Sequence, residues 1–96
     1  MKKLIVYNIL SLILIAQAFS QSRVSGNIFD EISDDPIGNV AIYDVTNDQI
    51  FYSDKNGFFD FEINENTYEL GFYLEGYTYL TKFLDNNYTN LTIKLS

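Results

Sequence analysis

Apolar and polar residues alternate with a period of two through most of the chain, and this pattern restricts it to β-structure. In residues 58–63, for example, Phe59, Phe61 and Ile63 take one side of the expected strand, while Asp60 and Glu62 take the other. No stretch keeps apolar residues at helical spacing for three turns, as an amphipathic helix requires. We therefore expect an all-β domain.

Seven runs of this kind are separated by turn-forming residues at nearly regular intervals. They cover residues 23–30, 39–45, 49–53, 58–63, 67–74, 78–84 and 91–95. Asn56-Gly57 is the strongest break between them, because both residue types tolerate the positive φ of a tight hairpin. Short strands with one buried face each favour a seven-stranded, antiparallel-rich β-sandwich, with a small closed barrel as the alternative.

Aromatic residues are expected to supply much of the buried area. Residues 21–96 contain fourteen Phe and Tyr, the sixteen of the full chain less Tyr7 and Phe19. Large rings would help a short domain without disulfides to form a core. We expect four residues of the run 67–74 to face inward: Tyr68, Leu70, Phe72 and Leu74. In the run 78–84, the pattern leaves open whether Tyr79 and Phe83 or Leu80 and Leu84 face inward.

Seven aromatic residues cannot all face inward by alternation, namely Tyr43, Phe51, Tyr52, Phe58, Tyr73, Tyr79 and Tyr88. Aromatic side chains on an outer strand face are common, because such residues favour β-strands and pair across them. Exposed rings can also mark a patch that binds sugar rings or a protein partner. Both interpretations stay open here.

The first twenty residues have the three-part pattern of a secretory signal peptide. Lys2 and Lys3 precede an apolar run at residues 4–16, and small residues follow it. This run of 13 residues is short, because crossing a bilayer takes about 20. We expect a signal peptide at 1–20, cleaved after Ser20 or else after Ala18, and a single domain at 21–96. An uncleaved amino-terminal anchor is the alternative.

Composition excludes most kinds of catalytic and metal site. The chain has no Cys and no His, which rules out disulfides, thiolate nucleophiles, imidazole catalysis and His-ligated zinc. Loss of Lys2 and Lys3 with the leader changes the formal net charge from −7 to −9, which argues against a nucleic-acid partner. We expect no enzyme activity, with no catalytic, cofactor-binding or metal-binding residue.

The acidic residues fit turns and solvated strand faces better than a glycosidase pair. They lie at 30–31 and 34–35, and at Asp60 and Glu62. Asp54, Asn56 and Asp60 resemble part of a calcium loop, but aromatic residues at 58–59 stand where such a loop needs oxygen ligands. No serine has a matching base, and there is no glycine-rich phosphate loop. Two sequons, at 87–89 and 90–92, are interpreted as a polar turn and a strand.

Four motifs, in order and in register, give the chain a family resemblance. They are VSGNIFD at 24–30 with PIGNVAI at 36–42, SDKNGFFDF at 53–61, YELGFYLEGY at 68–77 and LTIKL at 91–95. With this spacing, nearly all of residues 23–95 resembles the carboxypeptidase regulatory-like domain. That family's pattern specifies V-x-G-x-V-x-D, a Pro before V-x-V, [TS]-D-x-x-G-x-F and Y-x-L-x-F-x-x-x-G-Y. The resemblance implies a transthyretin-like (prealbumin-like) β-sandwich.

Several motif residues have clear structural roles. Gly57 is expected to let the backbone reverse between two strands. Gly76 serves the turn before Tyr77, whose ring can cover the end of the sandwich while its hydroxyl finds a partner. Pro36 fixes φ before the second strand. None of these roles is catalytic.

The resemblance also implies a setting. Such domains stand at the amino terminus of TonB-dependent outer-membrane receptors of Bacteroidota, after the catalytic domain of zinc carboxypeptidases, or in exported surface proteins. We therefore expect a non-catalytic exported accessory or interaction domain, in the periplasm or associated with the outer membrane. Its expected partner is a protein or a receptor neighbour, with carbohydrate as a further possibility. The alternatives are an amino-terminal fragment of a nutrient-uptake receptor and a small carbohydrate-binding module. We also expect the first and last strands to be edges that a partner strand could extend.

Overall fold

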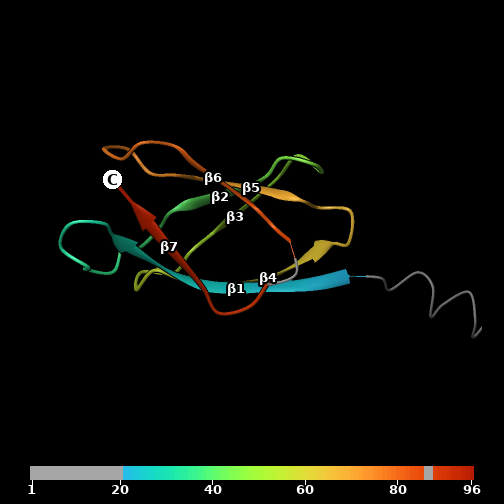
Figure 1. Cartoon of the computed structure of the whole chain (residues 1–96), viewed down its shortest axis with the longest axis horizontal. Coiled ribbons are helices and arrows are strands. Elements are labelled where there is room, and N and C mark those ends of the chain that lie inside the picture. Colours follow the sequence, from blue (N-terminus) through green and yellow to red (C-terminus); the bar gives the residue numbers. More distant parts are fainter. Residues whose placement is uncertain (1–20, 86–87) are drawn as a thin grey trace, which may run out of the picture.

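The computed structural model describes residues 21–85 and 88–96, which form two stacked β-sheets (Figure 1). The strands are β1 (Gln21–Asp30), β2 (Ala41–Asp44), β3 (Gln49–Tyr52), β4 (Phe58–Asn64), β5 (Glu69–Tyr73), β6 (Leu80–Phe83) and β7 (Leu91–Leu95). One sheet has the order β4-β1-β7 and the other β3-β2-β5-β6. All pairings between these strands are antiparallel except that of β1 with β7. The predicted all-β fold of seven strands in two sheets is confirmed. The expected signal peptide lies outside the described residues.

The core lies between the two sheets and is mostly aliphatic. Its buried apolar residues are Val24, Ile28, Ile37, Val40, Ile42, Phe59, Ile63, Leu70, Phe72, Leu84, Leu91, Ile93 and Leu95. Two of these are aromatic, Phe59 and Phe72, and their ring centroids are 5.8 Å apart. The expectation that aromatic rings supply much of the core is confirmed only in part: Phe59 and Phe72 are the two largest fully buried side chains, and four more rings, Phe51, Phe61, Tyr77 and Tyr88, pack against the core. β-Branched and leucine side chains fill the narrow space between the sheets, and most rings lie at its border or outside it.

Strand facing follows the alternation at nearly every position. In β6, where the pattern left two possibilities, Leu80 and the following Leu84 face inward, while Tyr79 and Phe83 are exposed. The prediction for Tyr68 is wrong, because its side chain is 57% exposed. Its neighbour Thr67 takes the inward position instead and donates a hydrogen bond to the buried carboxylate of Asp44.

The turn at Asn56-Gly57 joins the two sheets and does not form a tight hairpin. It connects β3 of one sheet to β4 of the other. Gly57 has a φ of 83°, as expected, but Asn56 is not among the residues with positive φ. The Asp54 carboxylate shapes this turn by accepting hydrogen bonds from the backbone N–H groups of Asn56 and Phe58. A side chain at Gly57 would meet the Ile28 carbonyl oxygen at 2.7 Å, so the position requires glycine.

The first strand is central and not an edge. β1 pairs with β4 through residues 21–27 and with β7 through residues 26–30. The expectation of an open edge is therefore wrong for β1 and confirmed for β7. The parallel β1–β7 pairing explains the difference, because it places β7 at the edge of the sheet and leaves β1 between β4 and β7.

Candidate functional site

The two outer faces of the sandwich differ in the kind of side chain that they carry. On the three-stranded sheet, Arg23 pairs with Asp60 at 2.7 Å and with Glu62 at 3.4 Å. A solvated outer face of this kind is ordinary for a β-sandwich. The outward positions of the four-stranded sheet carry mostly aromatic and aliphatic side chains instead. This second face is the candidate site.

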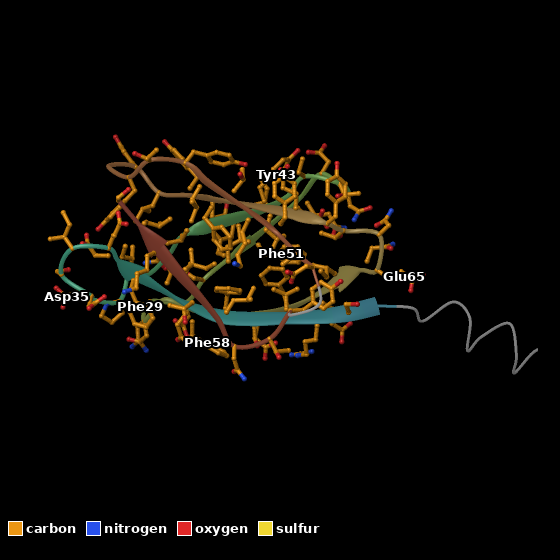
Figure 2. All side chains as sticks on the ribbon, viewed as in Figure 1. Phe29, Asp35, Tyr43, Phe51, Phe58 and Glu65 are labelled. Carbon is orange, nitrogen blue, oxygen red and sulfur yellow. The ribbon has the colours of Figure 1, made fainter. Side chains whose placement is uncertain are left out.

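We define the aromatic face by its outward side chains: Tyr43, Ile50, Tyr52, Tyr73, Tyr79 and Phe83. These come from β2, β3, β5, β6 and the residue just before β6. Tyr52 and Phe83 are 68% and 66% exposed, and Ile50, Tyr73 and Tyr79 are also exposed. Figure 2 shows Tyr43 on the outer side of the four-stranded sheet and Phe51 on its inner side. All four strands of this sheet therefore contribute to one apolar surface.

Two small residues, Ala41 and Gly71, lie between the large side chains of the aromatic face. Ala41 pairs with Tyr52 on one side and Tyr73 on the other, so a methyl group separates the two tyrosines. In the next row, Gly71 pairs with Tyr43. A Cβ atom at Gly71 would overlap the hydroxyl and the adjoining ring carbons of Tyr79, so the hydroxyl end of this side chain lies over the glycine. Tyr79 is nevertheless exposed, so part of its ring is available to a ligand.

A hydrogen bond fixes Tyr43 near the centre of the aromatic face. Its hydroxyl donates to the carboxylate of Asp48 in the turn between β2 and β3. This hydrogen bond is the main cause that raises the pKa of Tyr43 above its ordinary value, with burial adding to it. The phenol therefore stays neutral at physiological pH and remains a donor to Asp48.

A buried carboxylate anchors the same turn from the inner side. Asp44 is fully buried and accepts hydrogen bonds from the backbone N–H and side-chain amide of Asn47 at 3.1 and 3.0 Å. The Thr67 hydroxyl donates to it at 2.8 Å. These bonds tie the β2–β3 turn to the segment before β5. Asp44 thus holds in place the turn that carries Asp48.

The acidic residues considered in the sequence serve turns and ion pairs. At the end of β1, Asp30 accepts hydrogen bonds from the backbone N–H groups of Ile32 and Ser33 and from the Tyr77 hydroxyl. Asp34 forms an ion pair with Lys94 at 3.0 Å. The prediction for Tyr77 is confirmed, because its ring packs against the core while its hydroxyl has a partner.

Two of the three residues that resemble part of a calcium loop, Asp54 and Asp60, use their carboxylates in other interactions. The Asp54 carboxylate is occupied by two backbone N–H groups of its own turn. Asp60 pairs with Arg23 on the face of the three-stranded sheet. Within residues 21–85 and 88–96, no group of three or more acidic side chains is arranged to hold a metal ion. Asn87, the first sequon residue, lies outside the described residues.

Sequence reasoning found part of the aromatic face. Four of its tyrosines are among the seven aromatic residues noted above: Tyr43, Tyr52, Tyr73 and Tyr79. Two others of the seven, Phe51 and Tyr88, pack against the core, while Phe58 is exposed from a strand of the three-stranded sheet. Ile50 and Phe83 were missed. Alternation from Tyr52 could have identified Ile50, whereas Phe83 required knowledge of which side of β6 faces inward.

The described part of the chain contains no helix long and apolar enough to cross a membrane.

A family model, the CarboxypepD_reg-like domain, matches residues 24–96. The chain belongs to this family. No curated protein and no solved structure matches it. In this CarboxypepD_reg-like domain, the specified motif positions build turns and core, with the exposed Tyr68 as an exception. The residues of the aromatic face all stand at positions that the motifs leave open.

Proposed function

We propose that this chain is a non-catalytic exported domain that docks to a partner through its aromatic face. The contrast between the two outer faces carries this proposal. Folded domains rarely expose a contiguous apolar patch unless it takes part in binding. Tyr and Phe are also the residue types that are enriched where proteins meet partners.

The absence of catalysis in this proposal rests on the roles of the polar side chains. Asp30 and Asp54 accept hydrogen bonds from backbone groups of their own turns, and Asp44 anchors a third turn. Asp34 and Asp60 are in ion pairs. The family to which the chain belongs is a regulatory, non-catalytic one, which supports the same proposal.

The proposed location is the periplasm or the periplasmic side of the outer membrane. The leader-like pattern at residues 1–20 supports export. A receptor neighbour at the outer membrane then fits as a partner, as the family resemblance suggests. Reading the DNA that flanks the coding sequence tests the alternative, because a plug and barrel encoded in frame would make this domain part of an uptake receptor.

Site-specific photo-crosslinking tests the docking role. A photoreactive phenylalanine analogue is placed at Tyr73 on the aromatic face, or as a matched control at Phe58, which is similarly exposed on the other sheet. We expect adducts in the cell envelope from position 73 and few from position 58. Equal yields from both positions, or none from position 73, would contradict docking through the aromatic face.

A further inference from the structure

We propose that the partner of the aromatic face is a basic polypeptide segment, whose Arg and Lys side chains lie against the tyrosine rings. This inference rests on the proposed docking function and adds the chemistry of the partner. Three observations carry it: the exposed ring faces, the acidic residues beside them, and the distribution of basic residues over the molecule.

The rings are placed to receive cations. The side of an aromatic ring is electron-rich and attracts a guanidinium or ammonium group within about 6 Å of its centre. Tyr79 covers Gly71 with the hydroxyl end of its side chain and is still exposed, so part of its ring surface is open to solvent. Tyr52 and Tyr73 flank the small Ala41, so a side chain can lie between them. A basic residue with a long aliphatic stem could use both the apolar surface and the ring electrons.

Acidic side chains adjoin the aromatic face at one end. Glu69, the first residue of β5, pairs with Phe83 and therefore shares its side of the sheet. Asp48 lies in the adjacent turn, where it accepts the Tyr43 hydrogen bond. These two carboxylates give that end of the face a negative potential, which favours a positively charged partner.

Basic side chains are kept away from the aromatic face in the described structure. Arg23 and Lys94 belong to the three-stranded sheet, where both are in ion pairs. Lys82 of β6 pairs with Leu70, which faces the core, so it lies on the other side of the sheet from Phe83. Lys55 lies in the turn after β3. No cation on the outward positions of β2, β3, β5 or β6 therefore opposes a basic ligand.

Net charge distinguishes a basic partner from the other possible occupants. Residues 21–96 carry four basic and thirteen acidic side chains, a formal charge of −9. Such a charge speeds association with a basic partner and repels an anionic one. It also opposes a second copy of the same chain on this face. A neutral glycan would gain nothing from it.

Titration with a defined probe tests this inference. The probe is a short peptide of alternating glycine and arginine, blocked at both ends, added to protein expressed from the full sequence. The control peptide has citrulline in place of arginine, which keeps the shape and removes the charge. We expect amide NMR shifts in β2, β3, β5 and β6, at least fivefold weaker binding of the citrulline peptide, and affinity that falls as salt is added.

Two matched pairs of variants locate the site. Tyr73→Ser should weaken binding about two- to fivefold, as expected for one cation–π contact. Phe58→Ser, on the other outer face, should leave affinity unchanged. Glu69→Gln should weaken binding about twofold. Glu62→Gln removes the same charge from the other sheet and should have less effect. Amide spectra of each variant establish that it is folded.

The outcomes separate this inference from the proposed function. Three results would each overturn the inference of a basic partner. These are equal binding of both peptides, NMR shifts confined to β1, β4 and β7, and equal effects of the two substitutions within each pair of variants. Shifts on the aromatic face with a neutral glucan oligosaccharide, but not with the arginine peptide, would replace it by a sugar and keep the docking role. A dimer that Tyr73→Ser dissociates would replace it by a second copy. Failure of the position-73 crosslink would remove the docking role itself.

Discussion

The hydroxyl of Tyr77 donates a hydrogen bond to the carboxylate of Asp30 at 2.9 Å and so joins two loops at one end of the sandwich. Asp30 ends β1, and Tyr77 belongs to the loop between β5 and β6, so the bond links the two sheets. The same carboxylate accepts two backbone N–H groups from the loop that follows it. The backbone N–H of Thr78, which follows Tyr77 in the β5–β6 loop, donates a further hydrogen bond to the carbonyl of Ser96. The end of β7 therefore lies beside the β5–β6 loop (Figure 1).

Replacing Tyr77 by Phe should therefore destabilise the domain while keeping the ring in place. The variant loses the donor to Asp30 but not the packing of the ring against the core. We expect a lower urea midpoint with an unchanged dependence on denaturant, because the exposed surface area changes little. Tyr73→Phe, which removes a hydroxyl from the exposed aromatic face, is the control and should unfold like the original protein. Identical midpoints for all three proteins would show that the Tyr77–Asp30 bond contributes nothing.

Acid should reduce stability through the same carboxylate. The Ser33 backbone N–H, then the Ile32 backbone N–H and the Tyr77 hydroxyl, lower the pKa of Asp30 from its ordinary value of 3.8. A carboxyl group whose pKa is lower in the folded state than in the unfolded state stabilises the fold at pH values above its unfolded-state pKa. This stabilisation is lost as the pH falls through its folded-state pKa. Stability should thus decline below about pH 4. In Asp30→Asn, urea unfolding over a pH series should show a smaller decline, and an unchanged pH profile would contradict this role.

The Asp44 carboxylate should be the polar group on which the β2–β3 turn depends most. Asp44→Ala leaves the buried hydroxyl of Thr67 and the backbone N–H of Asn47 without their acceptor. An unsatisfied buried polar group costs about 1–3 kcal/mol, so we expect a loss of at least that size in urea unfolding. Asp44→Asn keeps one acceptor oxygen in the same volume and should lose less. If both variants unfolded alike, the hydrogen bonds would not be the cause.

The number of strands, their positions along the chain and the facing of most side chains could be predicted, because these features depend on local patterns. Val24, Ile28 and Ile93, for instance, are all buried, as the alternation of apolar and polar residues in their strands predicts. The partner of each strand depends instead on contacts between distant residues. The parallel pairing of Ile28 with Ile93 has no signature near either residue, which is why β1 was mistaken for an edge.

The aromatic face could be predicted only in part, for a related reason. Alternation shows that Tyr43 and Tyr73 face away from the core, but it does not show that their strands are neighbours. The exchange of Thr67 for Tyr68 as the inward residue depends on a buried carboxylate 23 positions earlier in the chain. The surface exists because β3, β2, β5 and β6 lie side by side, and that order is a property of the whole fold.

The two glycines in paired strands should respond differently to Ala, and this difference tests the construction of the aromatic face. At Gly71 the added methyl group meets the end of the Tyr79 side chain, which can swing outward. We expect a stability loss of no more than about 1 kcal/mol. At Gly26 the methyl group would meet the Leu91 carbonyl oxygen at 2.5 Å and the Phe59 ring at 2.6 Å, inside the core. Such overpacking costs about 1–3 kcal/mol or more.

Gly71→Ala should also weaken binding of the arginine peptide, because the added methyl group displaces the Tyr79 side chain from its place over the sheet. Urea unfolding and the peptide titration, applied to both variants, separate the two effects. The Gly26→Ala protein should be less stable, but its folded fraction should bind the peptide normally. Gly26 belongs to the three-stranded sheet, whereas the peptide is expected to bind to the four-stranded sheet. A Gly71→Ala protein that kept full affinity would show that the position of the Tyr79 ring does not matter for docking.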